Sequence, residues 1–212
     1  MLLGRRKFAL VTGIVGVVVA LTLLLGFGWV REYRPGLRPG ERYGVDVSHH
    51  QGVIDWQKVA GDDVSFAYIK ATEGADFVDE AFASNWEGAR TARLDRGAYH
   101  YFTLCSPGEE QARHYLEVVP LDPDALAPAV DLEQLIGPCA DPTSPQEVAT
   151  EVQAFLTAVE AATGKTPLLY MSDDFERQFP VTTLSEYPRW EPRLLRRPSD
   201  GWAIWQVSGF AH

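Results

Sequence analysis

Short apolar runs alternate with helical patterns along most of this chain, and this alternation constrains the fold more than any other feature. Six runs are expected to form strands, at residues 43–48, 66–71, 97–102, 127–133, 167–171 and 202–207. Strands that alternate with helices favour a parallel sheet with helices packed against it, which is the α/β class. Because strand-rich sequence follows five βα-like units, we expect a barrel rather than an open doubly wound sheet.

Two of the expected helices carry clear start signals. Ser144-Pro145-Gln146-Glu147 and Ser106-Pro107-Gly108-Glu109 each combine a capping box with proline at the first helical position. The first opens a helix that Gly164 should end, and one of its faces carries Val148, Val152, Phe155 and Val159. A similar stripe lies within residues 78–93, at Phe82, Trp86 and Ala89. We interpret both stripes as core packing.

The charge of the chain is unevenly distributed. Its net charge is −10 over 212 residues. Residues 1–42 hold 7 basic and 2 acidic side chains (+5), whereas residues 43–212 hold 12 basic and 27 acidic ones (−15). An acidic body argues against nucleic acid as a partner. No Gly-x-Gly-x-x-Gly follows the first expected strand, which disfavours a dinucleotide site, and we expect no cofactor.

The N-terminal part of the chain resembles a membrane anchor. Residues 8–30 are 23 residues without a charge, which is enough to cross a bilayer. Arg5-Arg6-Lys7 precede them, so the N-terminus should stay in the cytoplasm. We expect an uncleaved signal-anchor over residues 1–30 and a linker rich in Arg, Pro and Gly at 31–42. Cleavage is the alternative, although Gly26-Phe27-Gly28 is a poor cleavage site.

This arrangement predicts where the protein lies in the cell. A single span with a cytoplasmic N-terminus places the protein in the inner or cytoplasmic membrane. Its folded domain would then lie on the periplasmic or extracellular side. The membrane is therefore an expected partner, through the N-terminal helix.

The chain has two cysteines, Cys105 and Cys139. Each follows the end of an expected strand, and in a barrel such ends meet on one rim. In an exported domain both would lie in an oxidising compartment, where we expect them to form a disulfide. Two free buried thiols are the alternative.

Asp131 and Glu133 end an apolar run, Ala127-Pro128-Ala129-Val130-Asp131-Leu132-Glu133. Alternate residues of a strand share a face, so the two carboxylates should lie about 7 Å apart at Cβ, opposite an apolar layer. Buried carboxylates are costly unless a function requires them. Glycosidic cleavage needs such a pair, because one acid protonates the leaving oxygen and the other stabilises positive charge on the sugar. Two surface acids at a strand end are the alternative.

Polar and aromatic residues also mark the other expected strands, whose C-terminal ends carry the chemistry in α/β barrels. The candidate groove residues on these strands are Asp46, Tyr68, Lys70, Glu73, Tyr99, Tyr101, Tyr170, Trp205 and Gln206. Aromatic faces stack on the apolar faces of pyranose rings, and acids and amides bind the hydroxyl groups. The combination favours a sugar-binding groove.

Several of these residues have a structural interpretation as well. Asp46 could cap the turn after the first strand, and Lys70 could pair with a nearby acid. Tyr99 and Tyr101 could be ordinary barrel packing, which is the role we expect for Phe102.

A metal site is not expected. His49 and His50 lie close to Asp46 in the sequence, but adjacent strand residues face opposite ways, so both histidines cannot easily bind one ion. No His-Glu-x-x-His or cysteine-pair motif supports a metal site.

Five stretches of this chain resemble the glycoside hydrolase family 25 lysozymes, the Chalaropsis-type muramidases. They lie in family order across roughly residues 43–209, and five in order are highly specific. The stretches are Gly44-Val45-Asp46-Val47-Ser48-His49-His50-Gln51-Gly52 with Ile54-Asp55-Trp56, Phe66-Ala67-Tyr68-Ile69-Lys70-Ala71-Thr72-Glu73-Gly74, Gly97-Ala98-Tyr99-His100-Tyr101-Phe102, Pro128-Ala129-Val130-Asp131-Leu132-Glu133 and Trp202-Ala203-Ile204-Trp205-Gln206.

The resemblance implies a fold, a reaction and roles for three acids. The fold would be an irregular TIM-like (β/α)5(β)3 barrel, and the reaction cleavage of the β-1,4 bond between N-acetylmuramic acid and N-acetylglucosamine in peptidoglycan. Glu133 is similar to the family's general acid. Asp131 matches the acid that assists by steadying the substrate's own acetamido group, and Asp46 matches a third acid in the groove. The spacing of Asp131 and Glu133 does not separate retention from inversion of the anomeric centre.

Family members usually continue past the last strand into a turn bearing another Asp, whereas this sequence stops at His212. We therefore expect the barrel, residues 43–212, to be C-terminally incomplete. The leading hypothesis is a membrane-anchored muramidase with peptidoglycan glycan strands as its partner. The alternatives are an inactive barrel that binds peptidoglycan without cutting it, and a phage endolysin exported by a signal-anchor.

Overall fold

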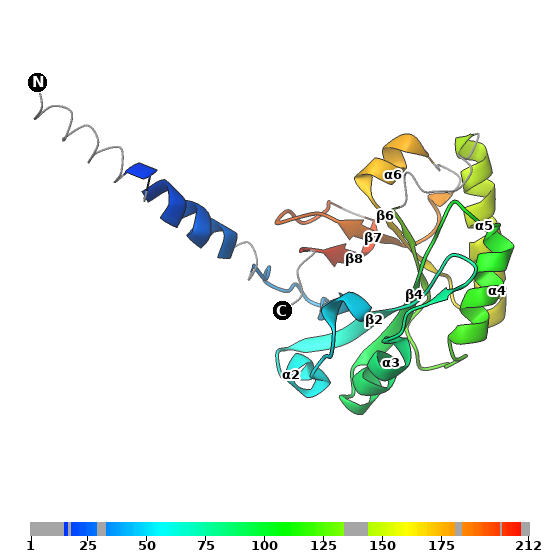
Figure 1. Ribbon diagram of the computed structural model, residues 1–212, viewed down its shortest axis with the longest axis horizontal. Helices are drawn as coiled ribbons and strands as arrows, with labels where there is room; N and C mark the ends of the chain where they lie inside the picture. Colours follow the sequence, from blue (N-terminus) through cyan, green and yellow to red (C-terminus); the bar gives the residue numbers. More distant parts are fainter. Residues whose placement is uncertain are drawn as a thin grey trace, which may run out of the picture.

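The computed structural model describes residues 15–16, 18–28, 33–133, 144–180, 184–199 and 201–208. Its strands form an α/β half-barrel with the order β1-β2-β4-β5-β6-β7-β8, parallel throughout, and β3 pairs antiparallel with β2 (Figure 1). The expected parallel sheet is confirmed. The strands are β1 (Tyr43–Val47), β2 (Val64–Glu73), β3 (Phe77–Val78), β4 (Asp95–Tyr101), β5 (Ala129–Leu132), β6 (Leu168–Met171), β7 (Arg189–Pro192) and β8 (Trp202–Gln206).

The sheet differs from the closed barrel expected from the sequence. In the part of the chain that the structure describes, no backbone pairing joins β1 to β8. The two edge strands are bridged by a side chain instead, because Nε2 of Gln206 donates to Oδ1 of Asp46 at 3.2 Å. Side chains of both edges line a groove of about 810 Å³ between them, and this separation leaves the barrel open.

Five helices follow five of the strands. The helices are α2 (Trp56–Ala60), α3 (Phe82–Thr91), α4 (Gly108–Val118), α5 (Pro145–Thr163) and α6 (Asp173–Gln178), and the short 3-10 helix η1 (His49–Gln51) precedes α2. The five βα units are therefore confirmed. The strands β3 and β7 were not expected. The first is only two residues long, and the second has the sequence Arg-Trp-Glu-Pro, which shows no apolar alternation.

Two hydrophobic cores lie on opposite faces of the sheet. The outer core, between sheet and helices, contains Val130 and Leu132 of β5, both fully buried. The inner core fills the concave side of the sheet and is built from Tyr68, Ala129, Leu168 and Trp190. Because successive strand residues face opposite ways, Asp131 lies on the same face as Ala129, on the inner side of the half-barrel.

Two motif glycines make room for rings of the inner face. A Cβ atom on Gly44 would lie 2.2 Å from the ring of Phe66, and a Cβ atom on Gly97 would lie 2.4 Å from the ring of Tyr68. Neither distance is compatible with a side chain. Glycine at these two positions therefore lets aromatic rings fill the inside of the half-barrel.

The two predicted helix starts differ in outcome. Ser144 caps α5 as expected, since its Oγ accepts from the backbone N–H of Glu147, and Gly164 ends the helix at φ 67°. Ser106 does not cap α4, which begins two residues later at Gly108. There the backbone N–H of Gly108 donates to Oε2 of Glu151 on α5 at 2.7 Å. A tertiary contact thus replaces the local cap.

Residues 33–42, expected to be a linker, lie against the folded domain. The hydroxyl of Tyr43 donates to the backbone oxygen of Pro35 at 2.7 Å. Arg197, in the connection that leads to β8, forms an ion pair with Glu41 in which both side chains are less than a fifth exposed. The segment therefore contacts both edges of the open sheet.

A chain that begins at residue 43 should be less stable than one that begins at residue 33. Deleting residues 33–42 removes Glu41 and leaves the partly buried guanidinium of Arg197 without that partner. Removing one member of a buried ion pair is destabilising, because the remaining charge is left without compensation. We expect a Tm lower by several degrees, measured by circular dichroism. Equal Tm values for the two chains would mean that the segment contributes nothing to stability.

The expected membrane span lies partly outside the described residues, which omit 8–14, 17 and 29–30. Residues 18–28 are helical, and their apolar side chains are exposed, as at Leu25 (73%). No helix among the described residues is long and apolar enough to cross a membrane.

The predicted disulfide stays a prediction, because Cys139 lies in residues 134–143, outside the described part of the chain. If it forms, Cys105→Ser should cost about 3–4 kcal/mol of stability in oxidising buffer. Under reducing conditions the variant and the parent should unfold alike. Thermal unfolding in both buffers tests this expectation, and identical Tm values in oxidising buffer would contradict the disulfide.

Candidate active site

The inner face of β5 places Asp131 between two tyrosines. Asp131 lies opposite Tyr101 of β4 and opposite Tyr170 of β6. Opposed residues of neighbouring parallel strands point to the same face, so the three side chains stand together at the carboxyl end of the sheet. This end is where α/β barrels carry out their chemistry.

The surroundings of Asp131 disfavour the charged form of its carboxyl group. Its Oδ1 is buried and has no hydrogen-bond partner among the described residues. Burial raises the pKa of Asp131 well above its usual value, and the charges of Glu133 and Asp46 raise it further. An unsatisfied buried carboxylate oxygen is a costly feature, and it is available to accept a hydrogen bond from a ligand.

Glu133 follows the last residue of β5 and is exposed to solvent. Burial raises the pKa of the neighbouring Tyr170 hydroxyl, and the charge of Glu133 raises it further. The carboxyl group therefore lies beside a tyrosine hydroxyl while remaining open to a ligand. This is the arrangement that a proton donor to a bound substrate requires.

Asp46 reaches the same site from β1. Burial raises the pKa of Asp46, the hydrogen bond from Gln206 lowers it, and the charge of Glu133 raises it. Glu133 thus perturbs both Asp46 and Asp131, although Asp46 lies on the edge strand β1 and the other two acids lie on β5 and just beyond its end. The structure brings together the three acids expected from the sequence.

Two tyrosines of β4 line the inner face beside these acids. Burial raises the pKa of Tyr99, and the charges of Asp46 and Asp131 add to the effect. Burial also raises the pKa of Tyr101 to about 12, with contributions from Asp131 and Glu133. Both hydroxyls are therefore neutral donors at any working pH. Their position agrees with the predicted contact to sugar.

Lys70 and Glu73 form a charged pair next to the tyrosines. The ammonium of Lys70 lies 2.5 Å from Oε2 of Glu73 and 4.8 Å from the ring centroid of Tyr101. The side chain of Lys70 is 9% exposed, so the pair holds a nearly buried cation at the edge of the acid cluster. The structural interpretation of Lys70, a partner for a nearby acid, is confirmed.

Tyr68 lies at the base of the groove between the sheet edges and belongs to the inner core. Its side chain belongs to the inner core, the residue is 2% exposed, and its ring packs 5.1 Å from that of Trp190. Its hydroxyl donates to the backbone oxygen of Ala127 at 2.9 Å. Tyr68 and Lys70 are two residues apart on β2, so their side chains lie on the same face of the sheet. Tyr68 is the deeper of the two.

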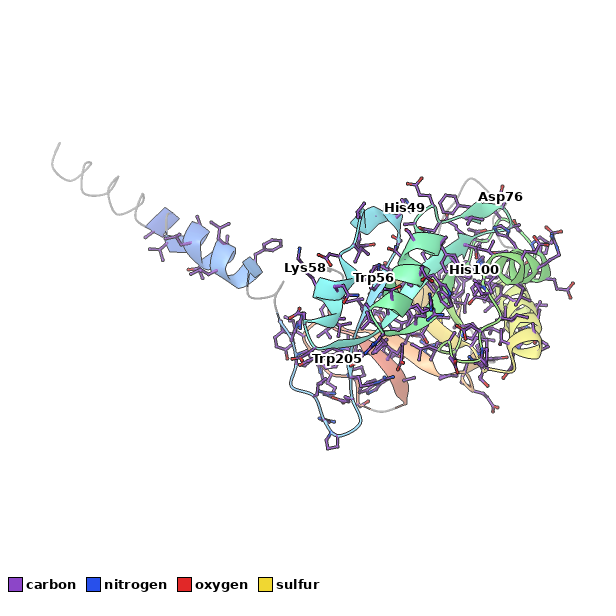
Figure 2. All side chains as sticks on the ribbon, turned by 90° about the horizontal axis from the view of Figure 1, so that it is seen from below. His49, Trp56, Lys58, Asp76, His100 and Trp205 are labelled. Carbon is purple, nitrogen blue, oxygen red and sulfur yellow. The ribbon has the colours of Figure 1, made fainter. Side chains whose placement is uncertain are left out.

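Trp205 is among the residues that line the groove between the sheet edges, and its side chain is bound to the connection between β7 and β8. It follows Ile204 of the inner face and precedes Gln206, so alternation places it on the other face of β8. Its indole N–H donates to the backbone oxygen of Arg193 at 2.7 Å, and Arg197 stacks on its ring at 4.8 Å. In Figure 2, Trp205 lies well away from His49, which follows the carboxyl end of β1. Trp205 therefore supports the β7–β8 connection.

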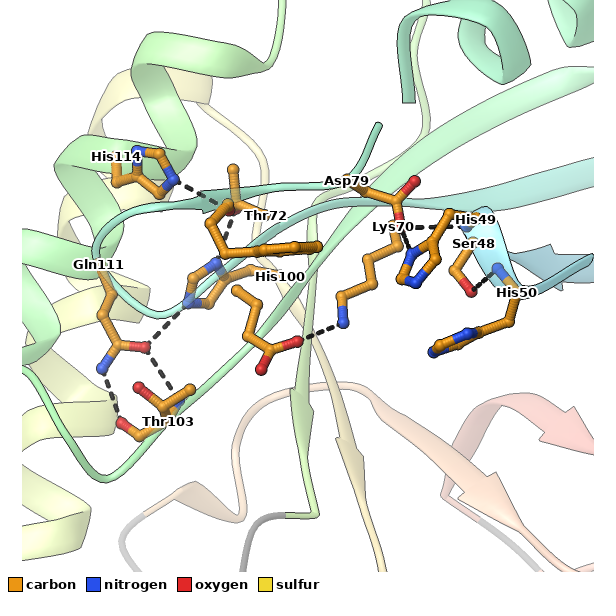
Figure 3. Close-up of polar contacts among 12 residues, drawn as sticks. Ser48, His49, His50, Lys70, Thr72, Asp79, His100, Thr103, Gln111 and His114 are labelled. Atoms are coloured by element: carbon orange, nitrogen blue, oxygen red, sulfur yellow. Dashed lines mark hydrogen bonds and ion pairs between the residues drawn. The ribbon is translucent and has the colours of Figure 1, made fainter. Parts of the chain in front are cut away.

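One buried contact near the acids could not be predicted from any sequence pattern. Oδ2 of Asp79 lies 2.7 Å from Nδ1 of His49, and the Asp79 side chain is completely buried (Figure 3). Asp79 follows the two-residue strand β3, which the pattern did not reveal. In the described part of the chain, no three His, Cys, Asp or Glu side chains are grouped to hold a metal ion.

The sequence model of the protein family "Glycosyl hydrolases family 25" matches residues 45–209 of this chain. The chain belongs to glycosyl hydrolase family 25. The resemblance found in the sequence is therefore confirmed, and the half-barrel described above is a family 25 fold. A family 25 glycosyl hydrolase from Bacillus anthracis superposes with a TM-score of 0.76 at 31% identity, covering 84% of this chain and 83% of that one.

Two curated relatives of the family 25 chain extend the comparison. The uncharacterised protein YegX of Escherichia coli is 36% identical over 175 residues, which cover 78% of this chain and 62% of YegX. Lysozyme M1 of Streptomyces globisporus is 40% identical over 102 residues, which cover 43% of this chain and 35% of the lysozyme. This chain thus spans about 62% of the length of the E. coli relative.

Proposed function

We propose that this family 25 protein is a muramidase, which hydrolyses the β-1,4 bond between N-acetylmuramic acid and N-acetylglucosamine in peptidoglycan. The observation that carries the proposal is the acid cluster on the inner face of the sheet, where Glu133 is exposed beside Asp131, whose Oδ1 is buried and has no hydrogen-bond partner among the described residues. Two acids in such different surroundings suit two different roles in one reaction. The similarity to Lysozyme M1 of Streptomyces globisporus supports the same substrate class.

Glu133 is the proposed general acid. It is open to solvent at the end of β5, so it can reach the oxygen of a glycosidic bond bound over the inner face. Proton transfer from Glu133 to that oxygen lets the C1–O bond break, and the ionised Glu133 then takes a proton from the incoming water. The hydroxyl of Tyr170 lies near this carboxyl group.

Asp131 is the proposed assisting acid. Its unpartnered Oδ1 can accept a hydrogen bond from the N–H of the substrate's acetamido group, and this contact would satisfy the buried oxygen. The oriented acetamido oxygen then attacks C1 as the leaving group departs, and the carboxylate stabilises the positive charge that forms. This course retains the anomeric configuration, whereas an inverted first-formed anomer seen by NMR would exclude it.

Mass spectrometry of digested peptidoglycan tests the proposed activity. Purified sacculi incubated with the protein should release soluble muropeptides whose new reducing end is N-acetylmuramic acid. New reducing ends on N-acetylglucosamine would assign a different bond. Retained binding to sacculi without any soluble product would instead identify a binding barrel.

We also propose that residues 8–30 anchor the protein in the cytoplasmic membrane. The uncharged run and the preceding Arg5-Arg6-Lys7 support this, together with the helix over residues 18–28. The full chain should stay in the membrane fraction after alkaline carbonate extraction, whereas residues 31–212 should be released. Release of the full chain by carbonate would contradict the anchor.

A further inference from the structure

The connection between β7 and β8 carries an exposed basic loop, residues 193–197, with the sequence Arg-Leu-Leu-Arg-Arg. The basic loop begins at the carboxyl end of β7, where the backbone N–H of Arg193 donates to the backbone oxygen of Gln206 at 3.0 Å. Leu194 is 66% exposed and Leu195 is 37% exposed. Exposed leucines between arginines form a surface that suits the boundary between lipid headgroups and acyl chains.

One arginine holds the basic loop in place, and the other two are left for a partner. Arg197 forms the ion pair with Glu41 and donates to the backbone oxygen of Gly36 at 2.9 Å. Arg193 and Arg196 are exposed, and neither guanidinium has an ion pair or a hydrogen bond among the residues that the structure describes. Because guanidinium groups bind phosphate oxygens well, these two side chains are open to an anionic ligand.

The contact with Gly36 brings a second basic segment to the same place. Leu37 is 46% exposed, and Arg38 is exposed with no partner for its guanidinium in the described part of the chain. In Figure 1 the connection from β7 to β8 and residues 33–42 lie on the same side of the domain. Residues 33–42 and residues 193–200 each hold three arginines and one acid (+2), whereas residues 43–212 as a whole carry −15. A basic region on an acidic domain indicates a negatively charged partner at this place.

The short chain between this region and the N-terminal helix points to lipid as that partner. Residues 18–28 are helical, and Arg34 already pairs with Asp62 of the domain. The chain from residue 28 to residue 33 covers at most about 18 Å. When residues 8–30 cross the bilayer, the exposed leucines and arginines therefore lie within reach of the headgroup layer.

We propose that the basic loop and residues 37–38 form a docking surface for anionic phospholipids. Arg38, Arg193 and Arg196 bind headgroup phosphates, and Leu194 and Leu195 enter the layer between headgroups and acyl chains. Because the basic loop begins at the carboxyl end of β7, docking holds the acid cluster, at the same end of the parallel sheet, close to the membrane surface. This inference rests on the proposed membrane anchor, and it implies that the glycan nearest the membrane is cut.

Photo-crosslinking in lipid vesicles tests the docking surface. The full chain carries p-benzoylphenylalanine in place of Leu194, in vesicles of phosphatidylcholine alone or mixed with an equal part of phosphatidylglycerol. Mass spectrometry identifies the molecule that the probe captures on irradiation. The matched control places the same probe at Leu121, which is 67% exposed but is followed by Asp122 instead of lying next to an arginine.

The probe at residue 194 should capture phosphatidylglycerol, whereas the probe at residue 121 should capture no lipid. Added salt should reduce the capture, because it screens the attraction of the arginines to the lipid phosphates. Equal capture at the two positions, equal capture in the two kinds of vesicle, or capture of a second copy of the protein would overturn the docking surface.

The same vesicles separate docking from anchoring. A chain that resists carbonate extraction but captures no lipid at residue 194 would overturn the docking surface and leave the anchor supported. Lipid capture at residue 194 by a chain that carbonate releases would support the docking surface and contradict the anchor.

Arg193→Gln combined with Arg196→Gln measures the contribution of the two charges. Each arginine near an anionic membrane contributes about 1 kcal/mol, which is about fivefold in the docking equilibrium. The double substitution should therefore weaken docking about 25-fold and remove most of the lipid adduct at residue 194. The matched control is Arg113→Gln on α4, which is exposed and lies on the opposite side of the domain (Figure 1). The parental adduct yield in the double variant would contradict phosphate binding by these arginines.

Discussion

Glu133→Gln should lower turnover on peptidoglycan by about 10²- to 10⁴-fold, the usual contribution of a positioned general acid. Glutamine has nearly the same size and can still accept a hydrogen bond, but its neutral amide is not an acid that can give a proton to the leaving oxygen. Glu133 lies beyond the end of β5 and is exposed, so the substitution should leave the fold intact. The measurement is the initial rate of release of reducing ends from purified sacculi.

A matched control separates the chemistry of Glu133 from the loss of one negative charge. Glu87→Gln makes the same change on α3, where Glu87 is exposed and pairs with Arg90. The control should keep the parental rate, and both variants should still bind sacculi in a sedimentation assay. A Glu133→Gln protein with most of its activity would show that another group protonates the leaving oxygen.

The sequence predicted those parts of the fold that depend on local pattern. Val130 and Leu132 alternate with Asp131, and they do lie in the outer core while Asp131 faces inward. Such alternation depends only on the geometry of a strand. Helix α5 was predicted for a similar reason, because its cap and its apolar stripe lie within one segment.

Contacts between distant segments could not be predicted from the pattern. The depth of Tyr68 inside the half-barrel depends on how neighbouring strands are offset, and no single strand records that offset. Gln206 and Asp46 were both expected to bind sugar, yet they bind each other across 160 residues. The contact of Asp79 could not be predicted from the pattern, because its partner, His49, lies 30 residues earlier in the chain.

Asp131→Asn should have opposite effects on activity and on stability. Turnover should fall by about 10²- to 10³-fold, because a neutral amide does not stabilise the positive charge that forms on the substrate. Stability at neutral pH should rise, because the variant no longer carries an ionised carboxylate with a buried, unpartnered oxygen beside Glu133 and Asp46. In a domain of this size the gain in Tm is about 2–4 °C per kcal/mol.

The size of this gain in stability depends on pH in a way that identifies Asp131 as its source. The pKa of Asp131 is raised in the folded protein above the usual value of 3.8, so between those two values the folded state binds a proton that the unfolded state has lost. Stability of the parent therefore falls as pH rises through that window. The asparagine variant lacks the loss of stability that ionisation of Asp131 causes. The difference in Tm between the variant and the parent should therefore be small at low pH and should grow until the folded Asp131 is ionised.

Thermal unfolding of the parent and Asp131→Asn across a series of pH values measures this difference directly. The exposed Asp124→Asn is the control, and its Tm should follow that of the parent at every pH. A variant that melts below the parent at neutral pH would mean that ionised Asp131 stabilises the fold, against the surroundings described here. A variant that melts higher and is inactive would mean that the protein keeps a destabilising carboxylate because its reaction requires one.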